Sequence, residues 1–391
     1  MKKYLFIMAQ EGYPWGGSEP LWSSAAEDLA RHGNEVRVSV KDWGAPVPQI
    51  EHLRSVGCVI IPRTEQYRIP AFLSRQIRKI FPQPPYRESH IRSVGNDVDL
   101  IVISQGDNSD GLEWLEAARA SGRRYVAIAQ SAVVYWWPTD DRAERLAKAY
   151  ESANATYFVS QAILDISRRQ FGSPLRNAKV VRNPFNVRYD ASPPWPNSGE
   201  RLALACVGRL DVISKAQDVL LQVLSLRHWR ERRIRVSLVG EGPNKRGLRR
   251  MSEQLGLTNV DFLGHADNVE DLWAKHHGLV LPSRFEGMPL AVVEAMLCGR
   301  PCIATDVGGN SELIQDGRNG FLAKAATVEL VDEAMNRAWE NRHRLKEIGQ
   351  EAAIDVRRWV SRDPGVDFAR ELAAVAGGES VGREYARIDT L

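Results

Sequence analysis

Segment 278–299 combines a strand, a tight loop and a helix in direct succession, and no other feature limits the possible folds as strongly. Residues 278–282 form a short apolar run, which is typical of a strand buried in a parallel sheet. Residues 289–298 then have a helical pattern, with Pro289 in the first turn and Gly299 where the helix would stop. Because open α/β sheets bind ligands at the carboxyl ends of their strands, the intervening loop is expected at a ligand site.

The loop and the helix of this segment each carry a glutamate, Glu286 and Glu294. If the helix is continuous, the two lie roughly 12 Å apart along its axis. Each carboxylate would then face a different part of an extended ligand. Free backbone N–H groups from Gly287 onward, together with the helix dipole, suit a phosphate group. Taken alone, a glutamate pair at this spacing is more often two solvated carboxylates on a helix.

The residues around the two glutamates resemble a known family. Glu286 begins the run Glu-Gly-x-Pro-Leu-x-x-x-Glu-Ala-Met, which is followed by Gly-Arg-Pro at 299–301 and Thr-Asp-Val-Gly-Gly at 305–309. This order closely resembles the retaining nucleotide-sugar glycosyltransferases of the GT-B fold, of the family 4 (glycosyltransferase group 1) type. The resemblance extends from Gly16 to Leu322. It implies an α/β protein with two Rossmann-like domains facing across a cleft.

The resemblance also assigns residues to the donor nucleotide sugar. Segment 208–221 matches the family pattern Gly-Arg-Leu…Lys-x-x-Asp-x-Leu-Leu, in which Arg209 offers a planar fork and Lys215 a point charge to a diphosphate. It implies that Glu286 holds the donor sugar hydroxyls and Glu294 the ribose hydroxyls. The expected catalytic residues are Arg209, Lys215 and Glu286. The full expected donor site comprises Gly16, Gly17, Gly208, Arg209, Lys215, Leu263, His265, Glu286, Gly287, Met288, Pro289, Leu290 and Glu294.

Gly16 and Gly17 follow the first apolar run of the chain, and two adjacent glycines permit close approach of a ligand to the backbone. Such a pair is otherwise common in ordinary turns. In the resembled family this loop approaches the donor diphosphate and the acceptor. Glu19, two residues further on, is therefore a candidate acceptor contact.

A second loop of the first domain, at 130–138, is also expected to contribute to acceptor binding. Many members of the resembled family have a histidine here, whereas this chain has Gln130 or Ser131. A glutamine can still form a hydrogen bond with a sugar hydroxyl. Tyr135 and Trp136 either stack on an acceptor sugar or pack in the core, and the sequence does not decide between the two.

Segment 63–92 is rich in arginine and has apolar residues on one helical face, so it predicts a basic amphipathic helix. The first interpretation is a surface helix packed on the sheet. The alternative is peripheral contact with an anionic membrane, which would suit an enzyme that acts on lipid-linked sugars.

Length and local composition predict two domains joined by a linker. Residues 1–190 are expected to form the N-terminal acceptor-binding domain and 201–375 the C-terminal nucleotide-sugar domain. Segment 191–200 is dense in Pro, Ser and Gly, as linkers are, and 376–391 is expected to be a tail.

Composition excludes several classes of partner. The net charge of +3 gives no indication of bulk nucleic-acid binding. The four cysteines are scattered and lack the spacing of a zinc site, so reduced thiols are expected. No secretory signal and no apolar run of membrane-spanning length occur. We therefore expect a cytoplasmic protein, with peripheral attachment to the inner face of the plasma membrane as an option.

The predicted function is retaining transfer of a hexosyl unit from a UDP- or GDP-sugar to a hydroxyl of a glycan, lipid-linked or small-molecule acceptor, as in bacterial cell-surface polysaccharide synthesis. No metal and no cofactor are expected, because the donor is itself a substrate. Two alternatives stay open. A nucleotide-sugar epimerase on the same fold would need a set of acid and base residues in the first domain that the sequence does not offer. A non-catalytic nucleotide-sugar-binding subunit is the other.

Overall fold

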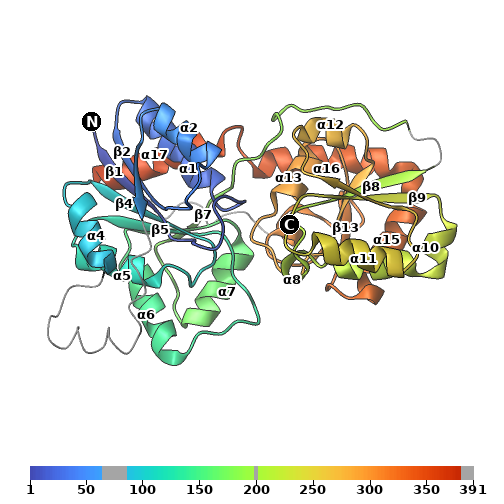
Figure 1. Cartoon of the computed structure of the whole chain (residues 1–391), viewed down its shortest axis with the longest axis horizontal. Helices are drawn as coiled ribbons and strands as arrows, with labels where there is room; N and C mark the ends of the chain where they lie inside the picture. The colour runs from blue at the N-terminus through green and yellow to red at the C-terminus, as the bar shows by residue number, and fades with distance from the viewer. Residues whose placement is uncertain (64–85, 198–200, 380–391) are drawn as a thin grey trace. The chain divides into compact units, whose positions relative to one another are not determined.

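The computed structural model describes residues 1–63, 86–197 and 201–379, and the chain divides into two compact units (Figure 1). Unit 1 comprises Met1–Pro184 and Asp363–Leu391, and unit 2 comprises Phe185–Arg362. Each unit is built on one parallel β-sheet flanked by helices. The predicted fold class, an α/β protein with two domains of this kind, is confirmed.

Unit 1 contains a seven-stranded sheet in the order β3-β2-β1-β4-β5-β6-β7, with every pair parallel. Its strands are β1 (Lys3–Met8), β2 (Glu35–Lys41), β3 (Val59–Arg63), β4 (Leu100–Gln105), β5 (Tyr125–Ala129), β6 (Ala155–Phe158) and β7 (Ala178–Val180). Its helices are α1 (Pro20–Arg31), α2 (Pro48–Ser55), α4 (Tyr86–Val94), α5 (Leu112–Ala120), α6 (Asp140–Glu151), α7 (Gln161–Phe171) and α17 (Pro364–Gly377).

The central strand β1 is buried on both faces. Leu5 and Ile7 belong to the hydrophobic cluster on one face of the sheet, and Tyr4 and Phe6 belong to the cluster on the other. Such two-sided burial is the reason that strands of this kind appear in the sequence as continuous apolar runs rather than as alternating ones.

Helix α17 packs in unit 1 although it follows the whole of unit 2 in the sequence. Its Phe368 and Leu372 lie in the same buried cluster as Leu21 of α1, and the Phe368 ring meets the Tyr157 ring edge-on at 4.9 Å. The structure thus differs from the predicted boundaries, which placed residues up to 375 in the second domain and a tail from 376. The helix continues to Gly377 because its apolar face covers the unit 1 sheet.

The prediction of a basic helix over 63–92 lies largely outside the described residues, since positions 64–85 are not among them. For Arg63 the prediction is wrong, because this residue ends strand β3 and is 4% exposed. Its guanidinium donates to the backbone oxygens of Ser39 in the neighbouring strand β2 and of Met8 at the end of β1, both at 2.6 Å. No helix within the described ranges is long and apolar enough to span a bilayer.

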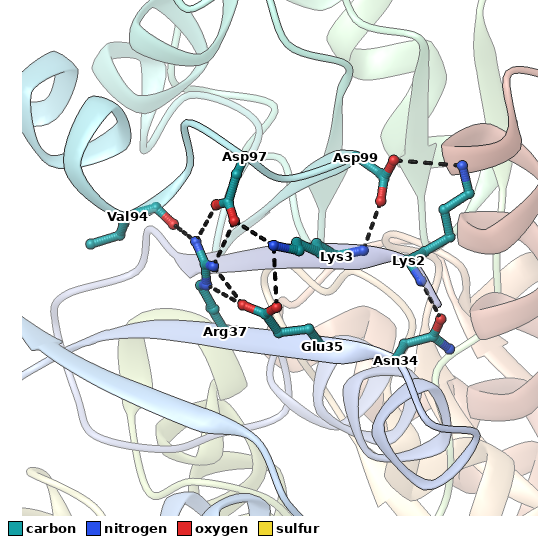
Figure 2. Close-up of polar contacts among 8 residues, drawn as sticks. All are labelled: Lys2, Lys3, Asn34, Glu35, Arg37, Val94, Asp97 and Asp99. Carbon is teal, nitrogen blue, oxygen red and sulfur yellow. Dashed lines mark hydrogen bonds and ion pairs between the residues drawn. The ribbon is translucent and has the colours of Figure 1, made fainter.

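Polar side chains connect the amino ends of β1, β2 and β4 (Figure 2). Asp97 accepts from Lys3 Nζ and Arg37 Nη1, both at 2.6 Å, and Arg37 also pairs with Glu35. Donation from Arg37 and Lys3 holds the pKa of Asp97 well below its usual range. Positive and negative side chains therefore balance at this edge of the unit 1 sheet.

Unit 2 contains a six-stranded parallel sheet in the order β10-β9-β8-β11-β12-β13. Its strands are β8 (Leu202–Val207), β9 (Ile234–Val239), β10 (Val260–Gly264), β11 (Gly278–Leu281), β12 (Cys302–Thr305) and β13 (Gly320–Ala323). Its helices are α8 (Val212–Lys215), α9 (Gln217–Ser225), α10 (Arg227–Glu231), α11 (Lys245–Gln254), α12 (Val269–Trp273), α13 (Leu290–Leu297), α14 (Asn310–Leu313), α15 (Val328–Glu340), the 3₁₀ helix η1 (Arg342–Arg344) and α16 (Leu345–Trp359).

The described part of the predicted linker, 191–197, belongs to unit 2. Arg300, which is 3% exposed, donates through Nη2 to the carbonyl oxygens of Pro193 (3.2 Å) and Pro194 (2.6 Å). The ring of Trp195 meets that of His277 edge-on at 5.4 Å. A buried arginine thus fixes this segment, although its composition is that of a linker.

Candidate active site

Each sheet reverses its strand order once, and the predicted site residues follow the strands on either side of that reversal. In unit 2 the reversal lies between β8 and β11, and in unit 1 between β1 and β4. Ligands of open α/β sheets bind beyond the carboxyl ends of the strands at such a point. Lys215 and Glu286 follow β8 and β11, whereas Gly16 and Glu19 follow β1.

The structure brings Lys215 and Glu286 into direct contact in unit 2. Lys215 Nζ donates to both carboxylate oxygens of Glu286, at 2.6 and 2.8 Å, and Ser283 Oγ donates to Glu286 Oε1 at 2.6 Å. The Glu286 side chain is 7% exposed and that of Lys215 is 20% exposed. Two predicted catalytic residues that are far apart in sequence therefore form one ion pair at the sheet edge.

A second ion pair fixes the segment that carries Lys215. Arg284 donates to both carboxylate oxygens of Asp218, at 2.9 and 2.8 Å, and its backbone N–H donates to Ser214 O at 2.8 Å. Asp211 caps helix α8 by accepting from the Ile213 N–H at 3.1 Å. The roles of Arg284, Asp218 and Ser283 in holding this segment were not predicted. Ser283 and Arg284 lie three and two residues before Glu286 in the same loop.

Glycine at 308 is required by the shape of the Glu286 loop. Gly308 has a φ of +55°, and a Cβ there would lie 2.2 Å from the carbonyl oxygen of Glu286. The next residue, Gly309, donates its N–H to Gly287 O at 2.8 Å, and Thr305 Oγ1 donates to Ser283 O at 2.6 Å. The motif at 305–309 thus packs against the Glu286 loop and forms hydrogen bonds with its backbone. These contacts account for the threonine and the two glycines of the motif.

Gly208 and Arg209 follow β8, and Gly208 lies close to Lys215. The Arg209 side chain is 46% exposed, and its Nη2 lies 3.0 Å from Asp211 Oδ2. A Cβ built on Gly208 would lie 3.5 Å from Lys215 Cε, so the aliphatic stem of Lys215 passes close to Gly208. The ammonium group at its end meets Glu286.

Glu294 lies in α13 and is 4% exposed. Its Oε1 accepts from the backbone N–H and the side-chain Nδ2 of Asn186, at 2.9 and 2.8 Å, and burial raises the pKa of Glu294 against the effect of these donors. The expected ribose contact stays a prediction. Pro289 is the residue before α13, not its first turn as predicted, since the helix begins at Leu290.

The remaining expected donor residues divide by exposure. Leu263 is 54% exposed and lies near the end of β10, and His265 directly after this strand is also exposed. Met288 is 6% exposed and is packed in the loop after β11. The exposed pair is available to a ligand, whereas Met288 contributes to packing, and their contacts with a nucleotide stay predictions.

In unit 1, Glu19 organises the glycine loop. Gly16 donates its N–H to Glu19 Oε2 and Ser18 donates its hydroxyl to Glu19 Oε1, both at 2.6 Å. The side chain is 1% exposed, and burial raises the pKa of Glu19 although both donors oppose this. The contact of Glu19 with the acceptor stays a prediction. In the structure its carboxylate binds the Gly16 N–H and so holds the glycine loop.

The loop after β4 holds two further carboxylates that the sequence analysis missed. Asp107 Oδ1 accepts from Ser109 Oγ at 2.6 Å and from the Asp110 N–H at 2.9 Å. Asp110 in turn accepts from the Gly106 N–H at 2.9 Å. Burial, and then the nearby Asp107, raises the pKa of Asp110 to about 8. The sequence Gly106-Asp-Asn-Ser-Asp, directly after a strand, could have predicted a polar loop at the carboxyl end of the sheet.

Gln130 and Asn183 form a buried amide pair beyond β5. Asn183 Nδ2 donates to Gln130 Oε1 at 2.8 Å, and the two residues are 5% and 6% exposed, respectively. Gln130 Nε2 and Asn183 Oδ1 have no partner among the described residues. The pair thus leaves one buried donor and one buried acceptor, and a hydroxyl group can satisfy a group of either kind. Ser131 is half-buried and takes no part in the pair.

The aromatic residues of the 130–138 loop are exposed rather than packed in the core. Tyr135 is 66% exposed and Trp136 is 37% exposed, so core packing, one of the two interpretations, is wrong. Gln170 Nε2 from α7 donates to the carbonyl oxygens of Val133 (2.8 Å) and Trp136 (2.5 Å), and its Oε1 accepts from Asn108 at 2.8 Å. A buried amide therefore holds an exposed aromatic loop.

Two family models together match most of the chain. Residues 15–189 match the Glycosyltransferase Family 4 model, and residues 201–341 match the Glycosyl transferases group 1 model. Lys215 and Glu286 fall in the second match, and Gly16 and Gln130 in the first.

Two curated proteins with related sequences are, by name, a mannosyltransferase and a synthase. One is a GDP-mannose-dependent alpha-(1-6)-phosphatidylinositol monomannoside mannosyltransferase of Mycolicibacterium smegmatis, 27% identical over 271 residues that cover 63% of this chain and 69% of that protein. Another is an N-acetyl-alpha-D-glucosaminyl L-malate synthase of Bacillus anthracis, 40% identical over 100 residues that cover 25% and 26% of the two chains.

Among solved structures, Anabaena Alr3699/HepE in complex with UDP superposes with a TM-score of 0.75 at 20% identity, over 95% of this chain and 100% of that chain. The same protein with UDP-glucose gives a TM-score of 0.73 at 19% identity, over 95% and 99%. At this level of identity the likeness shows a shared fold.

Proposed function

This chain belongs to the family 4 (group 1) glycosyltransferases, and from that premise we propose that it transfers a hexosyl unit from a nucleoside-diphosphate sugar to a hydroxyl group with retention of configuration. The observation that carries the proposal is the Lys215–Glu286 contact at 2.6 and 2.8 Å, beyond the carboxyl ends of the strands at the reversal point of the unit 2 sheet.

The proposed chemistry uses charge that is already in position. Departure of the nucleoside diphosphate leaves negative charge on its phosphates and positive charge on the sugar. Lys215, held by both carboxylate oxygens of Glu286, would stabilise the phosphate charge together with Arg209. A preorganised group of this kind contributes roughly 3–4 kcal/mol to transition-state stabilisation. Glu286 would accept hydrogen bonds from sugar hydroxyls, since an ionised carboxylate only accepts.

The donor base is proposed as uracil or guanine. The Anabaena protein is in complex with UDP in one structure and with UDP-glucose in another, whereas the Mycolicibacterium relative is named as dependent on GDP-mannose. The two names disagree, so both donors belong in the first assay. Glu294 is the proposed contact of the ribose, which the two nucleotides share.

The acceptor is proposed as a polyhydroxylated molecule, such as a growing glycan or a lipid-linked sugar of cell-surface polysaccharide synthesis. The donor and acceptor atoms of Gln130 and Asn183 that have no partner among the described residues suit hydroxyl groups. The exposed rings of Tyr135 and Trp136 offer flat apolar faces on which a sugar can stack. Both features are in unit 1.

The test is incubation with radiolabelled UDP-glucose and GDP-mannose, separately, with and without a panel of glycan and glycolipid acceptors. Transfer or slow hydrolysis of one donor supports the proposal, and NMR of the product anomeric proton tests retention. A changed sugar still attached to the nucleotide would instead indicate an epimerase. Tight nucleotide binding with no turnover for any acceptor would favour the non-catalytic subunit.

A further inference from the structure

A buried polar network on helix α7 connects two loops at the carboxyl edge of the unit 1 sheet. One is the loop after β4, a strand at the reversal point, and the other is the loop after β5, which carries the exposed rings of Tyr135 and Trp136. Helix α7 packs on the sheet through Ile163 and Phe171, which lie in the same buried cluster as Leu5 of β1. The helix is therefore a fixed support for side chains that reach the two loops.

Gln170, in the last turn of α7, makes the contact with the loop after β5. Its Nε2 donates to the carbonyl oxygens of Val133 (2.8 Å) and Trp136 (2.5 Å), and its Oε1 accepts from Asn108 Nδ2 at 2.8 Å. Both N–H groups of the amide are thus used, which offsets the cost of burying a side chain that is 2% exposed. With the amide turned over, its oxygen would face two carbonyl oxygens, so the partners permit one orientation.

Asn108 makes the contact with the loop after β4. Its Nδ2 donates to Ser167 Oγ of α7 at 2.9 Å as well as to Gln170, and the Tyr150 hydroxyl donates to Asn108 O and Gln105 Oε1, both at 2.9 Å. All five side chains of this network are at most 2% exposed. Asn108 thus fixes its own loop to α7 and, through Gln170, to the loop after β5.

The loop after β5 is held by its backbone, whereas its side chains extend to solvent. Gln170 binds main-chain oxygens at both ends of the segment 133–136. Val134, Tyr135 and Trp137 of this loop are 58%, 66% and 63% exposed. Neighbouring exposed apolar side chains of this kind mark interaction sites, and rings on a fixed backbone lose little freedom when a ligand binds. The network therefore presents a preorganised aromatic surface.

We propose that Gln170 is a positioning residue for the acceptor, which holds the aromatic loop in the conformation that stacks on an acceptor sugar and ties this loop, through Asn108, to the reversal point of the unit 1 sheet. The inference rests on the proposed function, because it takes the aromatic loop as part of the acceptor site. Gln170 is buried and acts through the loop, so its loss should weaken use of the acceptor and leave the donor unaffected.

Hydrogen exchange on the full chain tests whether Gln170 holds the loop. Gln170→Met keeps the length of the side chain and removes both donors, so exchange in peptides covering 131–138 should become about tenfold faster or more. Peptides from β4 report global unfolding and should be unchanged. Gln161→Met is the matched control, since Gln161 is exposed in the same helix and pairs with Asp165. Unchanged loop exchange in Gln170→Met, or an equal rise in the control, overturns the proposal.

Kinetics then separate positioning from a general loss of structure. With the acceptor found in the transfer assay, Gln170→Met should raise the acceptor KM by about tenfold. Affinity for UDP or GDP and slow hydrolysis of the donor, which needs no acceptor, should be unchanged. A fall in all three would indicate damage to the fold, and an unchanged acceptor KM despite faster loop exchange would mean that Gln170 does not position the acceptor site. Either result overturns the proposal.

Asn108→Ala provides the test if Gln170→Met does not fold. It frees Gln170 from the loop after β4 while both donors to Val133 and Trp136 remain, so the acceptor KM should rise by a smaller factor, about threefold. An unchanged acceptor KM in this variant also counts against the proposal. A wild type that uses no acceptor overturns the proposed function and, with it, this role. Because loop exchange is measured without substrate, the two failures are told apart.

Discussion

At the scale of single residues, Lys215 and Glu286 are linked so closely that substitution of either changes the environment of the other. The ammonium group meets both carboxylate oxygens, and the pair is largely shielded from water. A charge held in this way needs little rearrangement when a diphosphate develops negative charge. The consequences for the two residues nevertheless differ, because only one of them carries positive charge.

Lys215→Met is expected to lower kcat/KM by about a hundredfold or more, because it removes charge stabilisation that grows in the transition state. Arg209→Ala should act in the same direction. Steady-state assays with the active donor measure the effect, and circular dichroism should show an unchanged fold. Lys346→Met is the matched control, since Lys346 is an exposed lysine of α16. Near-normal turnover of both Lys215 and Arg209 variants would rule out their assignment.

Glu286→Gln should cut transfer severely and leave affinity for the free nucleoside diphosphate nearly unchanged, because the carboxylate is assigned to the sugar. Glu294→Gln should weaken nucleotide binding and lower kcat less, because its assigned partner is the ribose. Calorimetry with UDP and GDP, together with rate assays, tests the pair. The reverse pattern would mean that the two roles are exchanged.

At the scale of elements, loops are positioned by ion pairs and by partly buried carboxylates at the sheet edges. The pair Arg284–Asp218 connects the loop after β11 to the start of α9 and so fixes α8 between them. In unit 1, Asp110 and Asp107 close the loop after β4 by accepting from their neighbours' N–H groups. Each arrangement has a measurable effect on activity or on stability.

Arg284→Ala should lower kcat/KM by about tenfold to a hundredfold, because it releases the segment that positions Lys215 and small misplacements near the chemistry are costly. Since Arg284 acts through Lys215, kcat should fall more than the affinity for nucleotide. Arg227→Ala provides the control, because Arg227 forms an exposed pair with Glu231. A rise in KM alone would show that Arg284 contacts the donor directly.

Asp110 should make the stability of the protein fall as pH rises. Its pKa is about 8 in the folded chain against 3.8 ordinarily, so between these values the folded state holds a proton that the unfolded state has lost. Urea unfolding of the wild type should therefore show a loss of stability from pH 5 to pH 8. Asp110→Asn should reduce this loss, and an identical pH dependence in the variant would contradict the assignment.

At the scale of the whole molecule, unit 2 is a continuous stretch of chain inserted into unit 1. Leu372 of α17 is fully buried in the unit 1 cluster. Leu372→Ala should cost about 2–5 kcal/mol of unfolding free energy. Ile354→Ala in α16 is the control, because Ile354 is 50% exposed and surface changes cost at most about 0.5 kcal/mol. Urea titrations measure the unfolding free energy of both variants. Equal losses in the two variants would contradict the packing of α17 in the unit 1 core.

Local sequence determined part of this architecture and could not determine the rest. The strand, loop and helix at 278–297 follow from apolar runs, a proline and a glycine, and they form as predicted within one residue or so. The placement of Lys215 and Glu286 in one site followed from resemblance to a family, but their direct contact was not predicted, because nothing local connects two residues on different loops. Their roles in catalysis stay predictions.

The errors share a physical origin. Helix α17 has an apolar face that would suit either sheet, so its pattern predicts a helix without saying which unit it covers. Segment 191–197 has the composition of a linker, but the buried Arg300 supplies donors to its carbonyl groups. Arg63 was counted with an arginine-rich helix, yet it ends a strand and donates to Met8 and Ser39. Each outcome depends on a distant partner.

The return of the chain to unit 1 sets an order for biosynthesis. A ribosome releases all of residues 185–362 before it releases α17, so the nascent chain can complete unit 2 while the first-made unit still lacks one helix. Until then, the surface that Phe368 and Leu372 cover stays open to water, to chaperones and to other nascent chains. The domain that is translated first is thus the one that finishes folding last.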